Sequence, residues 1–198
     1  GDPAAEARAG ARVRPTTLGR ITSFYYLKYT TVGMFARRVE TMANFEDALE
    51  TLCDASEFDE IPVRHNEDQL NAQLAQSVRW KPQGGRAAMD SPHLKTQLLI
   101  QAFWGRVPLP IADYATDTKT VLDQALRVLQ SLVDVASDAG YYLAARLTMG
   151  LAQAVSQACF PDQDPLLAML PSHVTRAALD NLARQGVPSL RAPHHGLG

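Results

Sequence analysis

The stretch TDTKTVLDQALRVLQSLVDVASDAG, residues 116–140, decides the fold. Leucine, valine and alanine recur in it every three or four residues, which is the period of an amphipathic helix. Thr116 or Asp117 can cap its start, and Gly140 is typical of the position just beyond a helix end. The stretch therefore predicts one long helix over residues 116–139.

One side of this predicted helix is polar. Its polar residues follow one another at steps of four or three positions: Thr120, Gln124, Arg127, Ser131, Asp134 and Asp138. The apolar residues lie on the opposite side: Leu122, Ala125, Leu126, Leu129, Leu132, Val133 and Ala136. This pattern is typical of a half-buried helix in a bundle.

The polar side has two interpretations. In the simpler one it faces water, and Arg127 pairs with Asp123, four residues earlier on the helix. In the other it lines a groove for a single nucleic-acid strand, and Gln124 and Arg127 contact phosphates or base edges. Asp134 and Asp138 would repel phosphates, so the contact is expected in the first half of the helix.

The rest of the chain is also predicted to be helical. We expect helices over residues 18–29 and 32–42, two more after the caps Asn44 and Asn66, and others over 92–107, 141–158, 166–170 and 176–185. Thr16 or Thr17 can cap the first and Thr30 or Thr31 the second. Alternation of period two, typical of strands, is missing over any useful length. The expected fold class is all-α.

Composition restricts the function. Nineteen basic and 21 acidic residues give a net charge of -2, so nucleic-acid binding would have to be local. None of the four lysines follows a glycine, which excludes a phosphate-binding loop of the G-x-x-x-x-G-K-[ST] kind. Cys53 and Cys159 form no C-x-x-C pair and are expected to be buried thiols of an intracellular, soluble protein. No apolar run is long enough for a membrane span, and residues 1–15 suggest a disordered lead-in.

Candidates for catalysis are weak. Residues 59–62 (DEIP) begin like a helicase D-E-x-H box but lack its histidine. Residues 64–68 (RHNED) gather one histidine and two carboxylates, but consecutive residues at a helix start point apart, so a capped helix start is the better interpretation. His194 and His195 lie in a tail rich in glycine and proline. We expect no catalytic and no metal-ligating residue.

Several motifs together resemble a known family. They are TLGRITSFYYLK (17–28), PVRHNEDQLN (62–71), LLIQA (98–102), DY (113–114) with DTKTVLDQALRV (117–128), and DPLL (164–167) with LP (170–171). In this order and spacing they resemble the Sec63 homology module of Ski2-like superfamily 2 DExH helicases, over about residues 16–190. Tyr141 and Phe160 stand where the family usually has tryptophan.

The resemblance implies a helical bundle over residues 16–160, the start of a helix-hairpin-helix segment over 161–190, and a tail over 191–198. It implies that the long helix is a "ratchet" that touches the translocating single strand through Thr120, Gln124, Arg127 and Ser131. ATP and Mg²⁺ would belong to upstream RecA-like domains, which with a winged helix would be this module's neighbours. The module would then not be an enzyme by itself.

The family's implied roles are 3′-to-5′ unwinding, alkylation repair and ribosome quality control, in the nucleus and the cytoplasm. The alternative is a scaffold that docks protein subunits of the parent complex and touches no strand. That alternative predicts an exposed apolar patch near Phe103 and Trp104, although a tryptophan is more often buried.

Overall fold

The computed structural model describes residues 14–82, 88–163, 181 and 184–185. Its elements are α2 (Thr17–Phe24), α3 (Tyr29–Arg38), α4 (Phe45–Cys53), the 3₁₀ turn η1 (Ser56–Phe58), α5 (Glu67–Ser77), α6 (Pro92–Gly105), α7 (Asp113–Asp138) and α8 (Tyr142–Gln157). The described residues contain helices and no strand, so the prediction of an all-α fold is confirmed.

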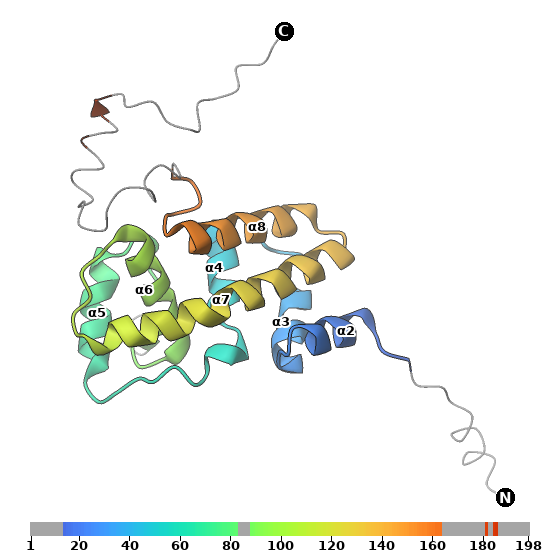
Figure 1. Ribbon diagram of the computed structural model, residues 1–198, viewed down its shortest axis with the longest axis horizontal. Coiled ribbons are helices and arrows are strands. Elements are labelled where there is room, and N and C mark those ends of the chain that lie inside the picture. Colours follow the sequence, from blue (N-terminus) through green and yellow to red (C-terminus); the bar gives the residue numbers. More distant parts are fainter. Residues whose placement is uncertain (1–13, 83–87, 164–180, 182–183, 186–198) are drawn as a thin grey trace, which may run out of the picture.

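The long helix α7 runs across the whole bundle (Figure 1). Its first half lies beside α5 and α6, and its second half lies over α2 and α3. After a short turn, α8 returns antiparallel along α7, and α4 packs between α6 and α8. Because α7 contacts helices from both ends of the bundle, its position determines where the other helices lie.

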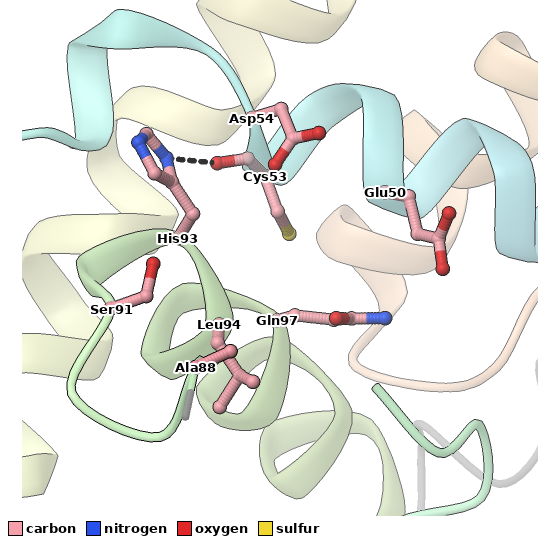
Figure 2. A pocket seen from close by; sticks show the side chains of 8 residues that line it. All are labelled: Glu50, Cys53, Asp54, Ala88, Ser91, His93, Leu94 and Gln97. Atoms are coloured by element: carbon pink, nitrogen blue, oxygen red, sulfur yellow. Dashed lines mark hydrogen bonds between the residues drawn. The ribbon is translucent and has the colours of Figure 1, made fainter. Parts of the chain in front are cut away.

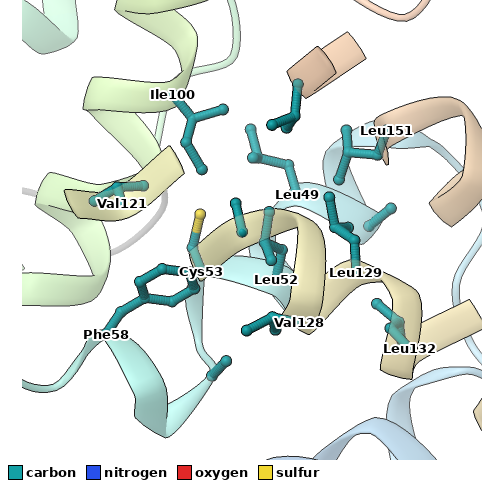
Figure 3. Close-up of a cluster of buried hydrophobic side chains, with 14 of the residues drawn as sticks. Leu49, Leu52, Cys53, Phe58, Ile100, Val121, Val128, Leu129, Leu132 and Leu151 are labelled. Atoms are coloured by element: carbon teal, nitrogen blue, oxygen red, sulfur yellow. The ribbon is translucent and has the colours of Figure 1, made fainter. Parts of the chain in front are cut away.

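The core is built on the apolar side of α7. Ala125, Leu129, Leu132 and Ala136 are buried there as predicted. Figure 3 shows α7 residues packed among leucines of α4 and α8 and Ile100 of α6. Leu126 was expected on this side but keeps 37% of its surface exposed, which corrects the predicted orientation of the helix.

The helix boundaries are confirmed where capping chemistry is strong. The Asn44 side chain accepts from Asp47 N at 2.9 Å, and Asp47 Oδ2 accepts from Asn44 N, so α4 begins with a capping box. Thr16 caps α2 through Gly19 N. Gly140 adopts φ +80 and ends α7 as predicted, while Tyr141 N donates to Ala136 O in a Schellman motif.

The junction between the first two helices differs from the prediction. The first helix ends at Phe24, not Tyr29, and the second begins at Tyr29, not Val32. Tyr26 adopts a left-handed conformation with φ 51, and Leu27 N donates back to Thr22 O. Glycine or asparagine is the usual sign of a left-handed residue that ends a helix, and tyrosine is rare in this conformation. The sequence therefore gives no local sign of this turn.

Three predicted caps have other roles. Thr31 is buried inside α3 and donates to Glu57 Oε2 at 2.6 Å. Asn66 precedes α5, but its side chain forms no capping hydrogen bond. Asp117 lies inside α7, which begins one turn earlier, at Asp113, and its carboxylate belongs to a cluster of charges. Thr31 and Asp117 are thus held by partners far away in the sequence and not by capping bonds.

Some predictions lie outside the described residues. These are the lead-in over residues 1–13, the helix over 166–170, most of the helix over 176–185 and of the helix-hairpin-helix segment, and the tail with His194 and His195. Both cysteines are described and are buried thiols, as predicted. Within the described part of the chain, no helix combines the length and the apolar character that crossing a bilayer requires.

Candidate nucleic-acid interface

The side of α7 that reaches the surface matches the predicted polar pattern only in part. From Thr116 onward its exposed positions are Thr116, Lys119, Thr120, Asp123, Leu126, Gln130, Asp134, Ser137 and Asp138. They form a stripe that shares Thr120, Asp134 and Asp138 with the predicted one. Thr120 belongs to this exposed stripe, while Gln124 and Arg127 lie half-buried at its edge.

Thr120 and Gln124 lie in the first half of the helix. The Thr120 hydroxyl donates to Thr116 O at 3.2 Å, one turn back along α7. This bond leaves the hydroxyl oxygen able to accept from a ligand, since a hydroxyl has two lone pairs. The predicted contact at these two residues is therefore compatible with their positions at and beside the exposed stripe.

Arg127 connects α7 to the end of α2. Its Nη1 donates to the carbonyl oxygens of Tyr25 and Tyr26, each at 2.9 Å. A guanidinium at this place satisfies carbonyls that a helix end leaves unpaired and suits the negative end of the helix dipole. The ion pair with Asp123, suggested by the spacing, is not formed.

In the second half of the predicted polar stripe, Ser131 and Asp134 have partners within the protein, while Asp138 is exposed. Ser131 is fully buried and its hydroxyl donates to Val128 O at 2.7 Å, so it is not accessible to a strand. This corrects its place among the predicted contact residues. Asp134 is exposed and accepts from the Tyr25 hydroxyl at 2.8 Å. α2 covers this flank, which the polar pattern of α7 alone could not reveal.

The first turns of α7 are held by a cluster of charges, which we call the ion cluster: the buried Glu67, Lys95 and Asp117, and the exposed Arg64 at its rim. Lys95 lies on α6 with no exposed surface, and its Nζ donates to Glu67 Oε2 at 2.6 Å and Asp117 Oδ2 at 2.7 Å. Arg64 Nη1 reaches Glu67 Oε1 at 2.9 Å and Asp117 Oδ2 at 2.8 Å. Two cations thus bridge two buried carboxylates from different helices.

The ion cluster changes the pKa values of its members. Burial alone would raise the pKa of Glu67, but hydrogen bonds from Lys95 and Arg64 outweigh this and lower it. Burial also opposes ionisation of Asp117, yet hydrogen bonds from Arg64 and Lys95 lower its pKa as well. Both carboxylates are therefore ionised at neutral pH, and the attraction between opposite charges joins α5, α6 and α7.

A second set of buried hydrogen bonds lies beside the ion cluster. The Tyr114 hydroxyl donates to Asn71 Oδ1 at 2.7 Å, and Asn71 Nδ2 donates to Met89 O at 2.7 Å. Lys95 Nζ lies 4.5 Å from the centre of the Tyr114 ring, within range of a cation–π contact. These bonds fix the start of α7 against α5 and α6.

Sequence reasoning did not find the ion cluster. Residues 64–68 were interpreted as a capped helix start, and Lys95 was used only to exclude a phosphate-binding loop. A signal was available in the sequence, because Lys95 is the only Lys, Arg, Asp or Glu between residues 92 and 105. A lysine that is buried with such a helix requires a carboxylate partner from another element.

The charges of the ion cluster leave little room for other chemistry. Each buried carboxylate accepts from both cations, and Arg64 Nε also lies 3.5 Å from Oδ2 of the exposed Asp113. In the described ranges, no group of three or more His, Cys, Asp or Glu residues is arranged to hold a metal ion.

Comparison with known proteins identifies the family. The family model described as the Sec63 Brl domain matches residues 15–194. The Arabidopsis thaliana protein "DExH-box ATP-dependent RNA helicase DExH14" is 41% identical over 178 residues, which are 90% of this chain and 8% of that protein. The chain thus spans a small part of such a relative.

Two human proteins give the same result. "Activating signal cointegrator 1 complex subunit 3" is 41% identical over 182 residues, 92% of this chain and 8% of that protein. "U5 small nuclear ribonucleoprotein 200 kDa helicase" is 37% identical over 178 residues, 90% of this chain and 8% of that protein. By its motifs, its helical fold and the match over most of its length, the chain belongs to the Sec63 Brl domain family and is a module of the kind found in Ski2-like DExH helicases.

Proposed function

We propose that this chain is an accessory module of an ATP-dependent DExH helicase and that α7 contacts the single strand on which the helicase acts. The names of the relatives support a helicase parent. In such a parent, ATP and Mg²⁺ act in the RecA-like domains, and the module lies next to them and to the winged helix. The chain alone is then expected to hydrolyse no ATP above the background of a mock preparation.

The finer assignment also belongs to this proposal. The motifs resemble the second, C-terminal cassette of the activating signal cointegrator 1 complex helicase, and the equivalent module of the spliceosomal helicase is the alternative. The first assignment implies 3′-to-5′ unwinding in alkylation repair and in ribosome quality control. It also implies that the parent acts in the nucleus and the cytoplasm.

The arrangement of Arg127 carries the proposal. A guanidinium has five N–H donors, of which the two on Nη1 bind the carbonyls of α2. The three donors on Nε and Nη2 have no partner among the described residues and lie at the edge of the exposed stripe. Arg127 can therefore hold α2 and bind a phosphate oxygen at the same time, without losing its structural contacts.

The surroundings restrict where a strand would lie. Between Thr116 and Arg127 the exposed charges are one cation, Lys119, and one carboxylate, Asp123, whereas after Arg127 they are the two carboxylates Asp134 and Asp138. A phosphate backbone is attracted to cations and repelled by carboxylates. We therefore place the strand over Thr120, Gln124 and Arg127 and not over the end of the helix.

Replacement of Arg127 tests the proposal. Arg127→Ala is expected to weaken binding of a fluorescent poly(dT) or poly(U) oligonucleotide, and to reduce the slope of log affinity against log salt by about 0.7 because one phosphate contact is lost. Fluorescence anisotropy at several salt concentrations measures both quantities. Unchanged affinity in a folded variant would contradict the proposal.

Arg127 also holds the end of α2, so a control variant must separate the loss of a phosphate contact from a displacement of α2. Tyr25→Phe removes the hydrogen bond to Asp134 and loosens the same contact between α2 and α7, but leaves the guanidinium in place. It is expected to bind the strand like the unchanged chain. If both variants lose affinity equally, the loss reflects movement of α2 and not a missing phosphate contact.

A docking scaffold remains the second candidate. The patch proposed at Trp104 is wrong, because Trp104 is buried against Trp80 and Phe160. Exposed large hydrophobic side chains instead occur at the turn between α2 and α3, at Phe24, Tyr26 and Tyr29, and on α8. The α8 surface, with Tyr142 and Met149, lies outside the contact between α2 and α7. If this surface docks a protein subunit, Tyr142→Ser should abolish co-purification with that subunit and leave strand binding unchanged.

A further inference from the structure

A cavity of about 270 Å³ lies between α4 and the start of α6, and it has no part in the interface proposed above (Figure 2). Glu50, Cys53 and Asp54 line it from the α4 side. Ser91, His93, Leu94 and Gln97 line it from the α6 side. A space of this size is suited to one side chain and is too small for an extended ligand.

Two polar atoms in this cavity have no partner among the described residues: Glu50 Oε1 and Gln97 Nε2. Gln97 is 6% exposed, so water reaches little of it. Figure 2 shows the Glu50 carboxylate and the Gln97 amide directed toward the same space. A buried polar group without a partner costs free energy, so two at one place indicate a group that is supplied from outside.

The other charged or ionisable polar groups of the cavity, His93 and Asp54, are already engaged. His93 Nδ1 lies 2.8 Å from Cys53 O, and His93 Nε2 lies 3.1 Å from Asp59 Oδ1. Asp54 pairs with Arg38 at 2.5 Å. The groups that remain for an external ligand are therefore the Glu50 carboxylate and the Gln97 amide.

The charge around Glu50 is negative. Burial raises the pKa of Glu50, and the charges of Glu46, Asp54 and Asp47 raise it further, while Arg38 alone opposes them. Among the described residues, the only cation beside this group of carboxylates is thus Arg38, which already pairs with Asp54. The carboxylates are those of Glu46, Asp47, Glu50 and Asp54. This excess repels phosphate groups and favours a cation, so the cavity is unsuited to nucleic acid.

We propose that the cavity binds the guanidinium group of an arginine side chain from a protein partner. A guanidinium presents donors in several directions of one plane, so it can reach Glu50 and Gln97 together, whereas a lysine ammonium acts as a point charge. The oxygen and nitrogen of the Gln97 amide exchange by a half-turn of the terminal torsion, so Gln97 can present an acceptor. The partner segment would then be basic.

A capped arginine, N-acetyl-arginine methylamide, tests the proposal. Titrated into the ¹⁵N-labelled 198-residue chain, it should shift the Gln97 side-chain NH₂ resonances and the Glu50 and Gln97 backbone amides along a saturating curve, with a Kd of about 1–10 mM. Capped citrulline has nearly the same shape but no charge, and it should bind about tenfold more weakly. Shifts that do not saturate, or equal binding of the two probes, would show a hollow that only solvent fills.

Two variants locate the site. Glu50→Gln removes the unpaired carboxylate and keeps its shape, so it should weaken binding of capped arginine about tenfold. Glu46→Gln removes the same charge from the same helix but does not line the cavity, so its binding should stay within about twofold. Equal loss in both variants would mean that only the overall negative field attracts the probe, which overturns the proposal. Unchanged helical circular dichroism shows that each variant is folded.

Discussion

The two halves of α7 use similar chemical groups under different solvent exposure. In the first half, the buried Asp117 meets Lys95, which has no exposed surface, and Arg64, which reaches it from the solvent side. In the second half, Arg127 and Asp134 meet the end of α2 at the surface. The difference teaches that burial decides the role of a charge: inside, its partners must be complete, while at the surface water can replace them and donors stay available for a ligand.

The largest expected difference between the halves is in stability. Lys95→Met leaves Glu67 and Asp117 buried with Arg64 as their only cation, and should lower the free energy of unfolding by about 3–5 kcal/mol. Arg127→Met, the same change in the other half, should cost only about 1 kcal/mol, because water can reach the carbonyls of Tyr25 and Tyr26. Urea unfolding followed by circular dichroism measures both. Equal losses would refute the contrast between the halves.

Acid should weaken the first half selectively. The pKa values of Glu67 and Asp117 are lowered by folding, so their contribution is complete above the ordinary carboxyl pKa of about 4 and is lost as the pH falls through their folded values. The raised pKa of Glu50 acts in the opposite sense. The test is to measure the urea midpoints of the unchanged chain and of Asp117→Asn at several pH values from 7 to 3. The difference between the two midpoints should become smaller as the pH falls. A difference independent of pH would contradict the assignment.

Tyr114→Phe tests the second set of bonds in the first half. The change removes the donor to Asn71 Oδ1 and leaves that oxygen buried, while the ring below Lys95 remains. It should cost about 1–2 kcal/mol, read from thermal or urea unfolding. A neutral result would mean that water reaches Asn71.

The smallest expected effect is that of Tyr25→Phe in the second half. Burial and the hydrogen bond to Asp134 raise the pKa of Tyr25 to about 12, so its hydroxyl stays a donor at all working pH values. Because the bond is exposed to solvent, its removal should cost about 0.5 kcal/mol. A loss comparable to that of Tyr114→Phe would remove the distinction between buried and exposed contacts.

Much of the fold was predictable from local signals. Three such signals involve only residues that are close together in the sequence, and they can be recognised there. They are the capping chemistry at Asn44, the left-handed glycine at Gly140 and the apolar spacing of α7. The turn at Tyr26 was missed because packing of Leu27, and not a residue preference, stabilises it. The candidate site was predictable only in part, since Ser131 follows the polar period yet is buried.

The sequence by itself determined the helical class, the long amphipathic helix and the family, because periodicity, caps and motifs are properties of neighbouring positions. Only the tertiary structure decided which polar residues of α7 remain accessible and that Lys95 is the centre of a cluster of charges. The physical reason is distance along the chain: Arg127 meets carbonyls more than 100 positions away, and Lys95 meets carboxylates 28 and 22 positions away. Such partners are brought together by folding and leave no pattern in either segment alone.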